Sequence, residues 1–150
     1  MATAALLLGL TVNCLRPEPL ALAAFDPSGT GKNLSSATLP EITLATLQGM
    51  IDRHEARVVD ARPSAFFALG HVPGAINLPL TELQGQKPAG EVRLSAAKED
   101  LLVVYCSDVS CPVAKSAARI LETLGYRRVM LFPGGWYAWK KAGLPVETGP

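Results

Sequence analysis

From Thr38 onwards, short apolar runs alternate with stretches in which apolar residues recur every three or four positions. The apolar runs predict strands, and the spacing of three or four predicts helices with one buried face. This alternation is typical of an α/β protein with a mostly parallel sheet. The strands are expected at Arg57–Asp60, Ala75–Leu78, Leu101–Tyr105 and Val129–Phe132.

Helices are expected between these strands. The clearest one follows the strand at 101–105, because Ala117, Leu121 and Leu124 share an apolar face and Gly125 is suited to end the helix. Shorter helices are expected after the capping residue Thr43, over Pro63–Leu69 and over Trp136–Ala142, with one helical turn at Thr81–Leu83.

The first 24 residues differ from the rest of the chain. Their apolar stretch, Ala4–Val12, is nine residues long, whereas a membrane span needs about 20. This length suits the apolar part of a signal peptide, and Ala21–Ala23 suits a cleavage site. No Lys or Arg precedes the stretch, so the alternatives are a disordered tail or the end of a longer anchor. Export or membrane association through residues 1–24 and a cytoplasmic location both remain open.

Composition narrows the class of protein. Residues 25–37 are rich in Gly and Ser and are interpreted as a linker to one folded domain at 38–148. With 14 basic and 13 acidic residues, the chain lacks the charge excess of a nucleic-acid-binding protein. Three cysteines without a CxxC spacing make a metal site unexpected. We expect no nucleic-acid partner, no metal and a monomer.

Candidate chemistry lies at Cys106, directly after the most apolar strand. Binding sites of open parallel sheets form at the carboxyl ends of strands. A short loop follows, and Pro112 is suited to begin the next helix. The loop amides are therefore expected to face the Cys106 sulfur, where they bind anions and stabilise a thiolate. An inert buried cysteine is the alternative. The candidate substrate-binding amides are those of Ser107, Asp108, Val109, Ser110 and Cys111.

Four segments carry a family resemblance: Val58–Arg62, Gly70–Asn77, Val103–Cys106 and Leu131–Trp136. In this order they resemble the motifs of the rhodanese (sulfurtransferase) family, over about residues 38–148. The resemblance implies a three-layer sandwich with a central, mostly parallel five-stranded sheet flanked by helices. It also implies a sulfurtransferase or sulfur carrier that needs no cofactor. The cysteine that ends the third motif would carry sulfane sulfur as a persulfide.

The resemblance also implies partners and supporting residues. The partners are a small sulfur donor or a persulfide-bearing protein, and a thiol or other nucleophilic acceptor. Asp60 and Arg62 are expected to support the site structurally, by ordering loop amides and by forming ion pairs. His71 is expected to fix a turn, with a role as general base for Cys106 as the alternative.

The loop departs from the family pattern, in which an Arg follows the cysteine after four variable residues. Cys111 stands at that position, and no Arg or Lys lies between Cys106 and Lys115. Without a guanidinium, a dianion such as thiosulfate loses bidentate recognition. We therefore expect inefficient thiosulfate:cyanide chemistry and favour a neutral or protein-bound donor. An inward-facing Asp108 would raise the pKa of the thiol.

Cys111 has a functional interpretation of its own. Five positions of separation permit a disulfide with Cys106, so Cys111 is a candidate resolving thiol. Whether the two cysteines form a disulfide stays open at this point. Two further classes of function also stay open. One is a thiol redox protein that uses this pair, and the other is a non-catalytic binding module with the same fold.

Overall fold

The computed structural model describes residues 38–84 and 94–149 of the chain. The described residues all belong to one unit of the chain, Ala37–Pro150. The expectations for residues 1–37, a signal or anchor segment followed by a linker, lie outside the described residues.

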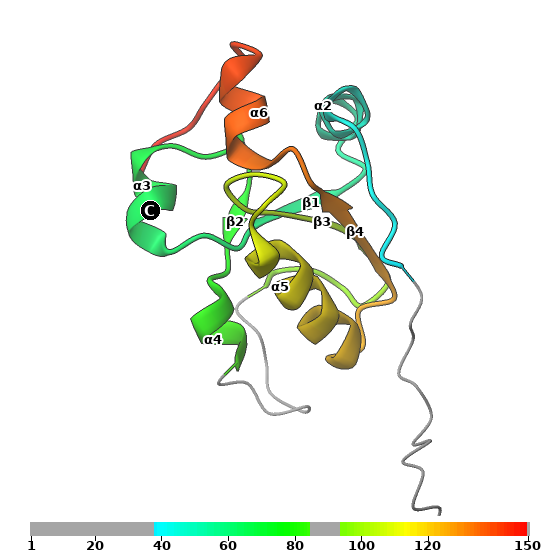
Figure 1. The fold of residues 1–150 in the computed structure, drawn as a ribbon. Helices are drawn as coiled ribbons and strands as arrows, with labels where there is room; N and C mark the ends of the chain where they lie inside the picture. The colour runs from blue at the N-terminus through cyan, green and yellow to red at the C-terminus, as the bar shows by residue number, and fades with distance from the viewer. Residues whose placement is uncertain (1–37, 85–93, 150) are drawn as a thin grey trace, which may run out of the picture. The chain divides into compact units, whose positions relative to one another are not determined.

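Within these described residues, four parallel strands form the central sheet in the order β2-β1-β3-β4 (Figure 1). Strand β3 pairs with β1 on one side and with β4 on the other, and all five of its residues are buried. A strand enclosed in this way reads as a continuous apolar run, which explains why it is the clearest strand in the sequence. The predicted α/β fold with a parallel sheet is confirmed. The strands are β1 (Arg57–Asp60), β2 (Ile76–Asn77), β3 (Leu101–Tyr105) and β4 (Arg128–Phe132).

The described residues form four strands where the family resemblance implies five, and one further segment reaches the sheet through a single bridge. Glu41 forms an isolated parallel bridge with Leu131 of β4. The N–H of Ile42 donates to the Leu131 carbonyl at 2.8 Å, and the N–H of Leu131 donates to the Pro40 carbonyl at 2.8 Å. Pro40 has no N–H to donate, so pairing cannot continue through it as a regular ladder.

Helices cover both faces of the sheet and complete the three layers (Figure 1). Leu102 and Val104 of β3 belong to the core that includes α4 and α5 residues, whereas Val103 and Tyr105 belong to the core that includes α2 and α6 residues. None of the helices in residues 38–84 and 94–149 is long and apolar enough to span a membrane. The helices are α2 (Leu44–Asp52), α3 (Ser64–Leu69), α4 (Leu80–Gln84), α5 (Pro112–Thr123) and α6 (Gly135–Lys141).

Local sequence signals explain where these helices begin and end. The Thr43 hydroxyl accepts a hydrogen bond from the Thr46 N–H at 3.2 Å and caps α2 as predicted. Pro112 is the first residue of α5, where a missing N–H costs nothing. Gly125 follows the end of α5 with a φ of 94°, a conformation that glycine adopts without steric penalty.

The first turn of α6 is clamped onto the chain that leaves β3. The N–H of Trp136 donates to the Cys106 carbonyl at 2.8 Å, and the N–H of Tyr137 donates to the Ser107 carbonyl at 2.9 Å. Gly135 permits this approach because a Cβ there would lie 2.5 Å from the Cys106 carbonyl oxygen and 2.7 Å from that of Ser107. The backbone position of Cys106 is therefore fixed by a residue about thirty positions later in the sequence.

Gly135→Ala is expected to lower the free energy of unfolding by about 3 kcal/mol or more, because it adds backbone overlap to an unfavourable φ of 59°. Gly143→Ala is the matched control, since its φ is 69° but a Cβ there would meet nothing within 4 Å. The control should cost only about 1–2 kcal/mol. Urea unfolding of both variants measures the difference, and equal losses would contradict the clamp.

Candidate functional site

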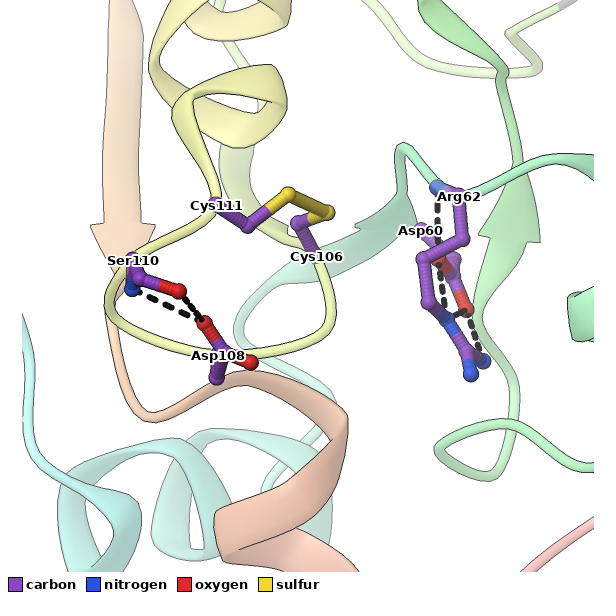
Figure 2. Close-up of a disulfide and its surroundings, with 6 residues drawn as sticks. All are labelled: Asp60, Arg62, Cys106, Asp108, Ser110 and Cys111. Atoms are coloured by element: carbon purple, nitrogen blue, oxygen red, sulfur yellow. Dashed lines mark hydrogen bonds and ion pairs between the residues drawn. A yellow bond between two sulfur atoms is a disulfide. The ribbon is translucent and has the colours of Figure 1, made fainter.

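Cys106 directly follows β3 and is joined to Cys111 by a disulfide (Figure 2). Their Cα atoms are 6.3 Å apart, within the range that disulfides span. Cys106 packs in the core beneath α5 and is only 4% exposed, whereas Cys111, at the N-cap of α5, is partly exposed. The sequence left the pairing open, and the structure joins the two sulfurs.

The loop between the two cysteines is folded around Asp108. Its carboxylate accepts hydrogen bonds from the Ser110 N–H at 2.8 Å and the Ser110 hydroxyl at 2.5 Å. Its carbonyl accepts from the Cys111 N–H at 3.1 Å. The amides of Ser110 and Cys111, expected to face the Cys106 sulfur, thus bond to Asp108. The Ser110 amide bonds the side chain, because an aspartate readily accepts from the N–H two residues later, and the Cys111 amide bonds the backbone carbonyl in a turn. Within the described part of the chain, no acceptor is bonded to the amides of Ser107, Asp108 and Val109.

Asp108 keeps a negative charge on this loop. The Ser110 hydroxyl and then the Ser110 N–H hold the pKa of the Asp108 carboxyl below its ordinary value. Figure 2 shows the carboxylate turned towards Ser110. The inward orientation considered from the sequence is therefore replaced by a turn within the loop itself.

A cavity of about 360 Å³ lies on the Cys111 side of the disulfide. Cys111 is among its lining residues and Cys106 is not. Lys115 contributes a positive charge to the lining, and Glu41 and Asp108 contribute negative charges. A small molecule in this cavity therefore lies against Cys111 and not against Cys106. The remaining lining comes from Val109 and Ser110 of the loop, from the start of α5 and from the end of β4 with Pro133.

Asp60 and Arg62 form a buried ion pair beside the loop. The Arg62 Nη2 lies 2.6 Å from Asp60 Oδ2, and the Arg62 N–H donates to the same carboxylate at 2.9 Å. Burial lowers the pKa of Arg62, but the hydrogen bond and charge of Asp60 raise it above its ordinary value. The guanidinium also donates to the Gly70 carbonyl at 2.8 Å and lies 4.8 Å from the centre of the Trp136 ring. Arg62 thus joins Asp60 to Gly70 and Trp136, which is the type of contact expected of residues that support a site structurally.

His71 is buried between α3 and the C-terminal segment. Its Nδ1 lies 2.9 Å from the Phe67 carbonyl, and its ring stacks on the Phe67 ring with centroids 3.6 Å apart. Its Nε2 lies 3.7 Å from a carboxylate oxygen of Glu147, whose backbone also bridges to His71. These contacts join His71 to α3 and to the C-terminal segment, and among the described residues none of its partners belongs to the Cys106 loop.

Tyr105 is a member of the site that the sequence analysis missed. Its hydroxyl donates to Asp60 Oδ2 at 2.6 Å and accepts from the Val72 N–H at 3.2 Å. Burial, and then the negative charge of Asp60, raise the pKa of Tyr105 far above its ordinary value. The available signal was the tyrosine itself, because a hydroxyl in a fully buried strand needs a partner. No group of three or more His, Cys, Asp or Glu side chains that could hold a metal occurs among the described residues.

Comparison with known proteins identifies a protein family for this chain. Residues 43–142 match the model of the rhodanese-like domain. The chain is 35% identical over 131 residues to the HTH-type transcriptional regulator Rv0324 of Mycobacterium tuberculosis, covering 87% of this chain and 51% of that protein. It is 32% identical over 136 residues to the 3-mercaptopyruvate sulfurtransferase of Escherichia coli, covering 75% and 47%. The chain thus spans about half the length of these relatives.

A solved structure shares the fold. The human single-domain sulfurtransferase TSTD1 superposes with a TM-score of 0.58 at 26% sequence identity. The superposition covers 69% of this chain and 97% of the human protein. The similarity therefore extends over almost the whole of a single-domain protein.

Tyr105→Phe is expected to lower the free energy of unfolding by about 1–3 kcal/mol at neutral pH, because two buried groups, the Asp60 carboxylate and the Val72 N–H, lose a partner. Tyr137→Phe is the matched control, since Tyr137 is 59% exposed. The control should change stability by less than about 0.5 kcal/mol. Urea unfolding measures both variants.

The stability advantage of the wild type over Tyr105→Phe should shrink as the pH rises above about 10, the ordinary pKa of tyrosine. The unfolded wild-type chain then loses a proton that the folded chain keeps, so alkaline pH favours its unfolding. The variant has no phenol at this position and lacks this effect. Unfolding at a series of pH values tests this. A gap that stays constant from about pH 8 to about pH 11 would contradict the raised pKa.

Proposed function

The chain belongs to the rhodanese-like domain family, and we propose that it transfers sulfane sulfur through a persulfide on Cys106. The observation that carries the proposal is the placement of this cysteine. It stands at the carboxyl end of the central strand, at the start of the loop that leads into α5. The similarity to proteins named sulfurtransferases supports the same chemistry.

The proposed transfer requires the disulfide to be reduced first. The Cys106 thiolate then attacks the sulfane sulfur of the donor, a sulfur–sulfur or carbon–sulfur bond breaks, and the remainder of the donor leaves. The product is Cys106–S–SH, from which an acceptor thiol takes the outer sulfur. The amides of Ser107, Asp108 and Val109 would bind the charge that develops. The Trp136 N–H, bonded to the Cys106 carbonyl, keeps the nucleophile in place.

Charge near the loop favours certain donors. No Arg or Lys stands between Cys106 and Lys115, and the carboxylates of Glu41 and Asp108 line the neighbouring cavity. Like charges disfavour a bound dianion such as thiosulfate. We therefore propose a donor with at most one negative charge, or a protein-bound persulfide.

A dithiol–disulfide redox function is the second candidate, and the observed Cys106–Cys111 bond favours it. In this function the pair itself accepts and donates electrons, and no sulfur atom is transferred. The mycobacterial relative, a transcriptional regulator by name, adds a non-catalytic role as an alternative for the domain. That alternative requires function to survive Cys106→Ala.

Persulfide formation on Cys106 is tested in the Cys111→Ser variant, which removes the thiol that pairs with it. After reduction, removal of reductant and addition of 3-mercaptopyruvate, the variant should gain about 32 Da, the mass of one sulfur atom. The double variant Cys106→Ser/Cys111→Ser should gain nothing. Cys14→Ser added to the Cys111→Ser variant should leave the gain intact. A gain that persists without Cys106 overturns the proposal.

The redox function predicts a reduction potential for the cysteine pair at or below about −200 mV, in the range of glutaredoxins. Equilibration in dithiothreitol buffers of graded composition, followed by thiol alkylation and intact-mass measurement, gives the potential. Cys14→Ser should leave the value unchanged. Failure of the two thiols to pair under a mild oxidant removes this candidate.

A further inference from the structure

We propose that Cys111 resolves the Cys106 persulfide within the same chain and releases its outer sulfur as hydrosulfide. The domain would then reduce sulfane sulfur to sulfide at the expense of an external dithiol. This inference rests on the proposed persulfide and adds an activity to it. It starts from the bond that the structure shows between the two sulfurs (Figure 2).

The covalent pairing determines which sulfur Cys111 reaches. A persulfide on Cys106 has an inner sulfur, the cysteine's own Sγ, and an outer sulfur from the donor. An acceptor that attacks the outer sulfur carries that atom away. The Cys111 Sγ is bonded to the Cys106 Sγ in the structure, so this loop conformation directs Cys111 to the inner sulfur. Attack there forms the observed disulfide and expels the outer sulfur.

The step balances in atoms and electrons. The Cys111 thiolate forms a bond to the Cys106 Sγ, the bond between inner and outer sulfur breaks, and HS⁻ leaves with that electron pair. The outer sulfur is reduced, and the two cysteines are oxidised to a disulfide. No oxidant is needed, because the sulfane sulfur is itself the electron acceptor.

The loop holds Cys111 in position by contacts other than the disulfide. The Cys111 N–H bonds the Asp108 carbonyl, and Ser110 bonds the Asp108 carboxylate with both its N–H and its hydroxyl. Cys111 also stands at the N-cap of the twelve-residue helix α5, where the helix dipole favours a thiolate. A nucleophile held in this way has a large advantage over a thiol in solution.

Burial makes the two ends of the disulfide unequal, and this determines how the site is regenerated. Cys106 is 4% exposed, whereas Cys111 lines the 360 Å³ cavity. A dithiol reductant therefore attacks the Cys111 Sγ, and Cys106 leaves as the thiolate that the next cycle needs. The second thiol of the reductant then closes on the first and frees Cys111. With 3-mercaptopyruvate as donor, the sum is 3-mercaptopyruvate plus dithiol giving pyruvate, hydrogen sulfide and a disulfide.

A single-turnover experiment tests the inference on the full chain. Reduced protein freed of reductant is given 3-mercaptopyruvate, and sulfide release and intact mass are followed together. The wild type should release about one equivalent of sulfide and end about 2 Da lighter, as the disulfide. Cys111→Ser should instead keep its added sulfur and release sulfide only after a thiol is supplied. Cys14→Ser should behave as the wild type.

The outcomes separate this inference from the proposed function. If the wild type keeps the added sulfur and releases no sulfide while Cys111→Ser also loads, Cys106 carries a persulfide but Cys111 does not resolve it, and the inference fails alone. If neither protein loads, the persulfide proposal itself fails. Glutathione added to the oxidised wild type should form its mixed disulfide on Cys111, and a mixed disulfide on Cys106 would overturn the proposed regeneration.

Discussion

A carboxylate that is fully shielded from water, that of Asp60, holds together the edge of the sheet on which the site is built. It accepts hydrogen bonds from Arg62 and Tyr105, so side chains as well as the backbone ladder join the ends of β1 and β3. A buried charge is tolerated only when it is paired and hydrogen-bonded. Arg62 extends the network to the Gly70 carbonyl and the Trp136 ring, and the Trp136 N–H in turn holds the Cys106 carbonyl.

Much of this framework was predictable from the sequence because its signals are local. The apolar run Leu101–Tyr105 predicts the central strand, and Thr43 marks the start of α2. The position of Cys106 follows from topology, since the residue after a central parallel strand must lie at the carboxyl edge of the sheet. Support by Asp60 and Arg62 was expected from family resemblance, and the structure shows the ion pair.

The other features of the site depend on tertiary contacts and on alternative hydrogen bonds, and the sequence alone does not determine which of them form. The amides of Ser110 and Cys111 were expected to face the cysteine sulfur, and they bond to Asp108 within the loop. Spacing permitted the Cys106–Cys111 bond without requiring it. The close approach of Gly135 involves residues far apart in the chain, and in the described residues a proline limits a further segment to one bridge with β4.

Successive side chains at the end of β3 point to opposite faces of the sheet, so Tyr105 and Cys106 lie in different layers. Tyr105 points into the layer of α2 and α6 with the hydrogen bonds that maintain the sheet, whereas Cys106 points into the layer of α5 with the disulfide. The side chains of the loop after Cys106 therefore take no part in the hydrogen bonds that join Tyr105, Asp60 and Arg62. Such a division lets evolution exchange one sulfur chemistry for another, or abandon it, while inheriting the same folded framework.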